Sequence, residues 1–141
     1  MSAKAKPAHS DYKLRILDQI VDAANRHDVR ALSRLLTDDG VYEDVTLKVK
    51  GNRETQRRLN EELFRSFPDL SYKLLNVIVG DNQVLAEFVM TGTNQASYGN
   101  RPPTGLSIRL PVAFVLRFSG QRIKRWKSYY DSATLLRQLG V

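Results

Sequence analysis

The chain has 141 residues, of which 42% are apolar and 26% are charged, and its formal net charge is +7. This length and balance are typical of one soluble globular domain with a sizeable core. With no cysteine and only two histidines, a disulfide framework, thiol chemistry and a Cys- or His-rich metal centre are excluded, so we expect no metal site.

The positive charge is concentrated in the second half of the chain. Residues 88–141 hold eight basic side chains and one acidic side chain, Asp131, whereas residues 1–87 hold 14 of each sign. The basic residues fall largely at alternating positions along predicted strands, which is typical of a solvated sheet face, so we do not expect nucleic acid as a partner.

The sequence gives no sign of a membrane span or a secretory signal. No apolar run approaches the ~20 residues needed to cross a bilayer, and the first residues lack the apolar segment of a signal peptide. We expect a cytoplasmic protein in which residues 1–10 form a disordered tail and residues 11–141 form a single domain.

Three helices are predicted in the first half of the chain. Apolar residues repeat at helical spacing over residues 11–26. Asp28 is a candidate N-cap for a short helix over residues 29–36, and Asn52 is a candidate N-cap for a third helix that extends to about residue 67.

The rest of the chain has the two-residue period of β-strands. A short strand is predicted at residues 41–45, after the break Thr37-Asp38-Asp39-Gly40. Further strands are predicted at residues 72–79, 83–93, 108–118 and 122–130. Helices followed by a run of antiparallel strands indicate an α+β fold. Long strands must coil, so we expect the sheet to enclose a cavity whose mouth lies near the Gly-, Asn- and Pro-rich loop at residues 94–105.

Asp131 is the first candidate for chemistry. A lone carboxylate in a basic, apolar, strand-rich region is either half of an ion pair or a working acid/base group. Because Asp131 precedes Ser132-Ala133-Thr134, it could also cap a C-terminal helical turn. From the residues alone these alternatives stay open.

Short segments in a fixed order resemble the SnoaL-like polyketide cyclases, within the superfamily of nuclear transport factor 2-like proteins. The resemblance extends over roughly residues 11–140. The segments are ANRHDV (24–29), LTDDGVYED (36–44), FPDL (67–70), TGT (91–93), PPTG (102–105) and LLRQLG (135–140).

The resemblance implies a cone-shaped α+β barrel in which three N-terminal helices pack on a strongly curved, mostly antiparallel sheet. It also implies a homodimer that needs no metal or cofactor. The family activity is intramolecular aldol ring closure, with an aspartate near the end of the last strand as acid/base, and Asp131 is the matching residue. Many members have a histidine after Gly-Thr where this chain has Asn94. An asparagine side chain can form a hydrogen bond in place of the histidine but cannot transfer a proton at neutral pH.

A pocket for a small hydrophobic molecule follows from the same expectation. The aromatic rings of Trp126 and Tyr130 would shape it, and Asn94 would donate to a ligand oxygen. The predicted pocket residues are Tyr42, Asp44, Phe88, Met90, Asn94, Trp126 and Tyr130.

Asp44 is the second carboxylate to consider. It follows Asp38-Asp39 much as the general base of ketosteroid isomerase, a member of the same superfamily, follows its own acidic pair. The oxyanion hole of that enzyme uses a tyrosine in the first helix, where this chain has Ile20, so steroid isomerisation is not expected. Asp44 either lines the cavity or holds a turn.

The leading hypothesis is a cofactor-free cyclase or isomerase that acts on a hydrophobic, polyketide-like carbonyl compound. Desolvation in an apolar cavity would raise the pKa of an aspartate toward useful values. The alternative is a non-catalytic small-molecule-binding or dimerisation module, which a cavity that neither Asp131 nor Asp44 reaches would favour. A third possibility is an epoxide-hydrolase-like reaction, which would need a site of paired acids and an arginine. The spacing of these residue types along the sequence does not predict such a site.

Overall fold

The computed structural model describes residues 11–141, so the tail predicted at residues 1–10 lies outside the described residues. Three predicted helices are confirmed as α1 (Tyr12–Asn25), α2 (Val29–Arg34) and α3 (Arg53–Ser66). The predicted caps are also confirmed. The Asp28 side chain accepts a hydrogen bond from the Ala31 amide, and Asn52 forms a capping box with Thr55.

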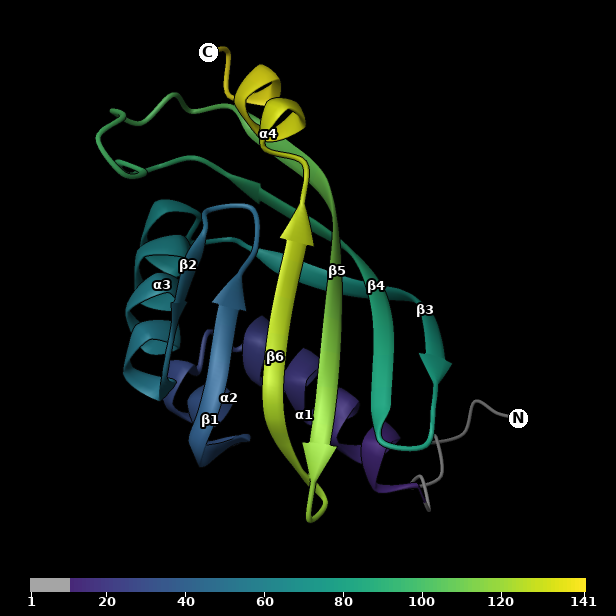
Figure 1. Ribbon diagram of the computed structural model, residues 1–141. Coiled ribbons are helices and arrows are strands. Elements are labelled where there is room, and N and C mark those ends of the chain that lie inside the picture. The colour runs from purple at the N-terminus through teal and green to yellow at the C-terminus, as the bar shows by residue number, and fades with distance from the viewer. Residues whose placement is uncertain (1–10) are drawn as a thin grey trace.

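Six strands form one curved sheet in the order β2-β1-β6-β5-β4-β3 (Figure 1). Every neighbouring pair is antiparallel except β1 with β6, which is parallel. The strands are β1 (Leu36–Asp44), β2 (Val49–Gly51), β3 (Ser71–Val79), β4 (Gln83–Thr93), β5 (Ser107–Ser119) and β6 (Arg122–Tyr130). The α+β class and the bounds of β4 and β6 agree with the prediction.

Four details differ from the prediction. The first strand begins at Leu36, because the expected break at residues 37–40 lies inside β1, where the pairing with β6 shifts register. The short strand β2 was not assigned, and the C-terminal helix α4 (Ser132–Gln138) was considered only as a helical turn after Asp131. The sheet also has free edges at β2 and β3, so the expected barrel is an open, curved sheet.

The helices α1, α2 and α3 lie on the inner side of the sheet, and α4 follows β6 at one end (Figure 1). Apolar residues at every second position of β5 form much of the core, because alternate side chains of a strand point to the same face. The buried residues are Ile108, Leu110, Val112, Phe114, Leu116 and Phe118. The turn from β5 to β6 has positive φ at Gly120 and Gln121, as a tight two-residue hairpin requires. No helix of residues 11–141 is long and apolar enough to cross a membrane.

Candidate active site

A cavity lies between the helices and the inner face of the sheet, as the sequence predicts. Its volume is about 70 Å³, several times what one buried water needs, so it suits a compact ligand. Most of the lining is apolar or aromatic. These lining residues include Ile20, Leu59, Leu63, Phe64, Met90, Leu110, Phe114 and Trp126.

About half of the polar side chains of the cavity come from β1 and β6. These strands pair with Tyr42 opposite Trp126 and Asp44 opposite Ser128. Because strand side chains alternate in direction, residues two apart share the inner face, and Tyr130 joins them from β6. Gln56, Asn60 and Glu62 from α3, together with Tyr72 and Tyr98, complete the polar lining.

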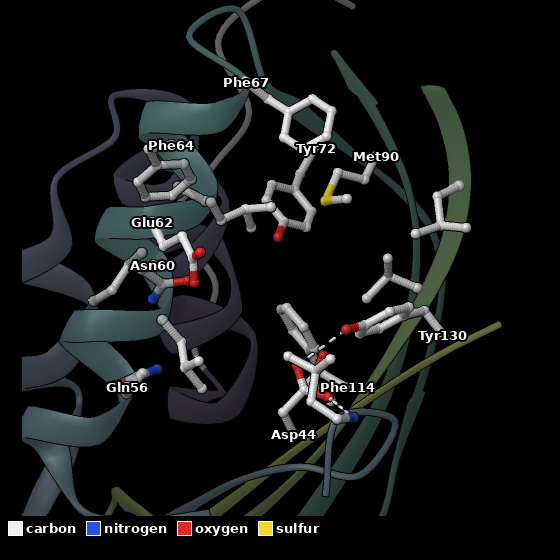
Figure 2. A pocket seen from close by; sticks show the side chains of 18 of the residues that line it. Asp44, Gln56, Asn60, Glu62, Phe64, Phe67, Tyr72, Met90, Phe114 and Tyr130 are labelled. Carbon is white, nitrogen blue, oxygen red and sulfur yellow. Dashed lines mark hydrogen bonds between the residues drawn. The ribbon is translucent and has the colours of Figure 1, made fainter. Parts of the chain in front are cut away.

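Asp44 is held at the end of β1 by the turn that follows it. The residue is 7% exposed. Its Oδ1 accepts a hydrogen bond from the Leu47 amide at 2.8 Å, and Tyr130 Oη donates to its Oδ2 at 3.5 Å (Figure 2). The turn is fixed to β6 because the Thr46 hydroxyl donates to the Tyr130 carbonyl at 2.7 Å and accepts from the Tyr130 amide at 3.0 Å. Asp44 therefore has a defined position in the cavity.

The electrostatics of the cavity favour acid/base chemistry at Asp44. Burial raises the pKa of Asp44 above its ordinary value, against the opposing effect of hydrogen bonds from Leu47, Tyr130 and Thr46. Burial also raises the pKa of Tyr72, Tyr98 and Tyr130. The tyrosines therefore stay protonated at neutral pH and serve as hydrogen-bond donors, while Asp44 is a stronger base than an exposed aspartate.

Two other lining residues carry buried polar atoms with no partner. Gln56 is 1% exposed and Trp126 is 2% exposed. Within residues 11–141, neither the amide nitrogen and oxygen of Gln56 nor Nε1 of Trp126 has a hydrogen-bond partner. The same part of the chain contains no group of three or more acidic or histidine side chains that could hold a metal ion.

Asp131 does not line this cavity. It is exposed and caps α4, since its Oδ1 accepts from the Ala133 amide at 3.1 Å and its Oδ2 accepts from the Thr134 hydroxyl at 2.7 Å. The Thr134 and Ala133 hydrogen bonds lower the pKa of Asp131. Tyr130 is the last strand residue to face inward, and the chain leaves the sheet directly after it. The structure therefore favours the capping alternative for Asp131.

Asn94 is buried at 1% exposure but also lies outside the cavity lining. Its amide nitrogen donates to the carbonyls of Ala96 at 2.9 Å and Ser66 at 3.4 Å. Its side-chain oxygen accepts from the Thr104 amide at 2.8 Å and the Thr104 hydroxyl at 3.1 Å. These four bonds use the full capacity of a carboxamide, so Asn94 holds the loop at residues 94–105 and has no donor left for a ligand.

We expect Asn94→Ala to lower the free energy of unfolding by roughly 2–4 kcal/mol, because several buried backbone and hydroxyl groups would lose their partner. Chemical denaturation followed by circular dichroism measures this change. The exposed Gln95, substituted by Ala, is the matched control and should change stability little. A loss of ligand binding by Asn94→Ala without a loss of stability would contradict this role.

The cavity brings together five of the residues predicted from the sequence: Tyr42, Asp44, Met90, Trp126 and Tyr130. Phe88 is buried beside it and packs on Phe114 with the ring centroids 4.9 Å apart, so it belongs to the core behind the cavity wall. The sequence analysis did not identify Gln56, Tyr72 or Ser128 as site residues. A signal existed for Gln56, since it is the polar member of the otherwise apolar helical stripe with Leu59 and Leu63.

Comparisons with known proteins agree with this architecture. The model of the SnoaL-like polyketide cyclase family matches residues 14–139. None of the curated proteins matches the sequence significantly.

Among solved structures, AclR from Streptomyces galilaeus, provisionally assigned as a hydroxylase, is 22% identical with a TM-score of 0.81, covering 92% of this chain and 95% of that one. IdmH from Streptomyces antibioticus, provisionally assigned as a polyketide cyclase, is 22% identical with a TM-score of 0.77, covering 89% and 96%. A protein from Catenulispora acidiphila with a ketosteroid isomerase-like fold is 20% identical with a TM-score of 0.76, covering 89% and 92%. At these identities the likeness shows the fold.

Proposed function

Since the chain belongs to the SnoaL-like polyketide cyclase family, we propose that it is a cyclase or isomerase in which Asp44 is the acid/base group. The observation that carries this proposal is a buried carboxylate with a raised pKa in an apolar cavity. Such a group is a characteristic feature of sites that move a proton at carbon. The substrate would be a compact hydrophobic compound with at least one carbonyl group.

The proposed reaction begins when ionised Asp44 removes a proton from the carbon next to the substrate carbonyl. The electrons of the C–H bond move into the carbonyl system and form an enolate, while Asp44 becomes a neutral acid. In a cyclase the enolate carbon attacks a second carbonyl carbon of the same molecule, and the new alkoxide takes the proton back from Asp44. In an isomerase Asp44 returns the proton to a different carbon.

The remaining polar groups support this chemistry from fixed positions. The protonated hydroxyls of Tyr72, Tyr98 and Tyr130 line the cavity and would donate to developing negative charge on the substrate oxygen. Tyr130 also contacts Asp44 and would keep the carboxylate directed at the substrate. The apolar wall excludes water, which strengthens each of these interactions.

A non-catalytic module is the weaker candidate, because Asp44 lines the cavity. The Leu47 amide uses only Oδ1 of Asp44, and a second carboxylate oxygen in a mostly apolar site carries a desolvation cost that binding an apolar molecule does not require. The homodimer stays a prediction from the family. It is consistent with exposed apolar residues on the outer face of the sheet, such as Leu75 at 59% and Leu85 at 39% exposure.

Enolisation is the step shared by both reactions, and it can be tested without the natural substrate. In D₂O, the protein should accelerate deuterium incorporation next to the carbonyl of 2-tetralone, as measured by NMR. Asp44→Asn should remove the acceleration. A wild-type rate equal to that of buffer, for this ketone and for a series of smaller cyclic ketones, would count against the proposal.

Stability should depend on pH through the same group. A carboxyl group with a raised pKa in the folded state favours folding while it is protonated, and this contribution is lost as the pH rises from its ordinary pKa of about 3.9 through its folded pKa. Asp44→Asn should therefore melt at a higher temperature than the wild type at pH 7, and the difference should shrink toward pH 4. A difference that stays constant with pH would show that Asp44 is not desolvated in the folded protein.

A further inference from the structure

Gln56 and Trp126 are buried polar residues that the proposed proton transfer does not use. Both line the cavity, and within residues 11–141 the side-chain nitrogen and oxygen of Gln56 and Nε1 of Trp126 have no hydrogen-bond partner. Buried polar atoms in folded proteins are nearly always paired, because an unpaired group loses its bonds to water without replacement. An unpaired group inside a cavity points to a bound molecule that completes it.

The two residues approach the cavity from different elements. Gln56 lies near the start of α3, and Figure 2 shows its side chain on the helix side of the cavity, across from Asp44 and Tyr130. Trp126 lies on β6 opposite Tyr42, with the two ring centroids 6.1 Å apart. Gln56 and Trp126 therefore line the same cavity as the proposed base.

The position of Gln56 on its helix argues against a purely structural role. Leu59 and Leu63 line the cavity from the same helix, and so do Asn60 and Glu62, which are less buried than Gln56. A leucine at position 56 would fill the space without an unpaired amide, whereas a glutamine there loses its hydrogen bonds to water. Buried polar groups placed at such a position commonly fix the orientation of a ligand.

We infer that Gln56 and Trp126 form a recognition site for a ligand that carries a carbonyl oxygen and a hydroxyl group on nearby carbons, such as a β-hydroxy ketone. The Gln56 amide nitrogen and Trp126 Nε1 are donors and suit the carbonyl oxygen. The Gln56 amide oxygen is an acceptor and suits the hydroxyl group. This inference rests on the proposed function, because an aldol closure places a hydroxyl group and a carbonyl group on carbons two bonds apart.

Binding without turnover tests the inference. Indane, 1-indanone and 3-hydroxy-1-indanone share one carbon skeleton and add the carbonyl and hydroxyl groups in turn. Their dissociation constants are measured by isothermal titration calorimetry on the wild type, Gln56→Leu, Trp126→Phe and the control Gln83→Leu, which alters an exposed glutamine at the start of β4.

The wild type and Gln83→Leu should bind 3-hydroxy-1-indanone roughly 5–100-fold more tightly than indane, as expected for buried polar groups that gain partners. Gln56→Leu should bind indane at least as tightly and lose most of that preference. Trp126→Phe should weaken both indanones relative to indane. If Gln56→Leu does not fold, as judged by circular dichroism, Gln56→Met is used in its place with the same expectation.

Three results would overturn the inference: a wild type that does not bind 3-hydroxy-1-indanone, equal affinity for the three compounds, or a preference that survives in both Gln56 variants. In each case the unpaired amide would hold only water. The deuterium-exchange measurement on Asp44 does not depend on Gln56, so failure of the inference and failure of the proposed function give different results.

Discussion

Asp44→Asn is expected to lower the rate of enolisation by roughly 10²–10⁴-fold, the usual contribution of a placed general base. Asparagine has nearly the same shape and keeps an oxygen for the Leu47 amide, which lies 2.8 Å from Asp44 Oδ1. The substitution therefore removes the base and leaves the turn at residues 45–48 in place. Single-turnover deuterium exchange with 2-tetralone separates this loss from any change in binding.

Asp131→Asn is the matched control, because it changes the other carboxylate proposed from the sequence in the same way. Asparagine is as good a helix cap as aspartate, and Asp131 is exposed at the start of α4. Its activity should equal that of the wild type. A large loss in Asp131→Asn together with full activity in Asp44→Asn would reverse the assignment and restore the expectation drawn from the family.

The elements of the fold were largely predictable because their signals are local. The cap of α3 is set by Asn52 and Thr55, which are three residues apart, and the alternation along β5 continues without interruption for 13 residues. The strand β1 was cut short because Thr37-Asp38-Asp39-Gly40 has the composition of a turn. It nevertheless lies inside the strand, because Leu36 before it and Val41 after it both pair with β6, more than 80 residues away along the chain.

The site was harder to predict because it depends on which strands are neighbours. The approach of Asp44 to Tyr130 follows from the register of β1 against β6, and no local pattern encodes a parallel pairing between the first and last strands. The sequence analysis selected Asp131 because it is the only carboxylate in a basic region. The charge pattern of a sequence, however, does not determine whether a side chain points into a cavity or into solvent. Asp131 directly follows Tyr130, and in an extended chain a step of one residue reverses the face.

Tyr130→Phe should lower the rate of enolisation at neutral pH by about 10–100-fold and move the acid limb of the pH–rate profile to higher pH. The Tyr130 hydroxyl donates to Asp44 Oδ2 and lowers the pKa of Asp44, because a hydrogen bond to the ionised form favours that form. Without this bond, Asp44 stays protonated to a higher pH and is held less firmly toward the substrate, and small misplacements of a reacting group are costly.

The neighbouring Tyr129 provides the matched control, since it is 38% exposed and does not line the cavity. Tyr129→Phe should leave both the rate and the pH profile unchanged. A rate loss in Tyr130→Phe without a shift of the acid limb would mean that Tyr130 acts on the substrate oxygen and not through Asp44. An unchanged rate and profile would remove Tyr130 from the proposed mechanism, and the position of Asp44 would then depend on the Leu47 amide and the turn fixed by Thr46.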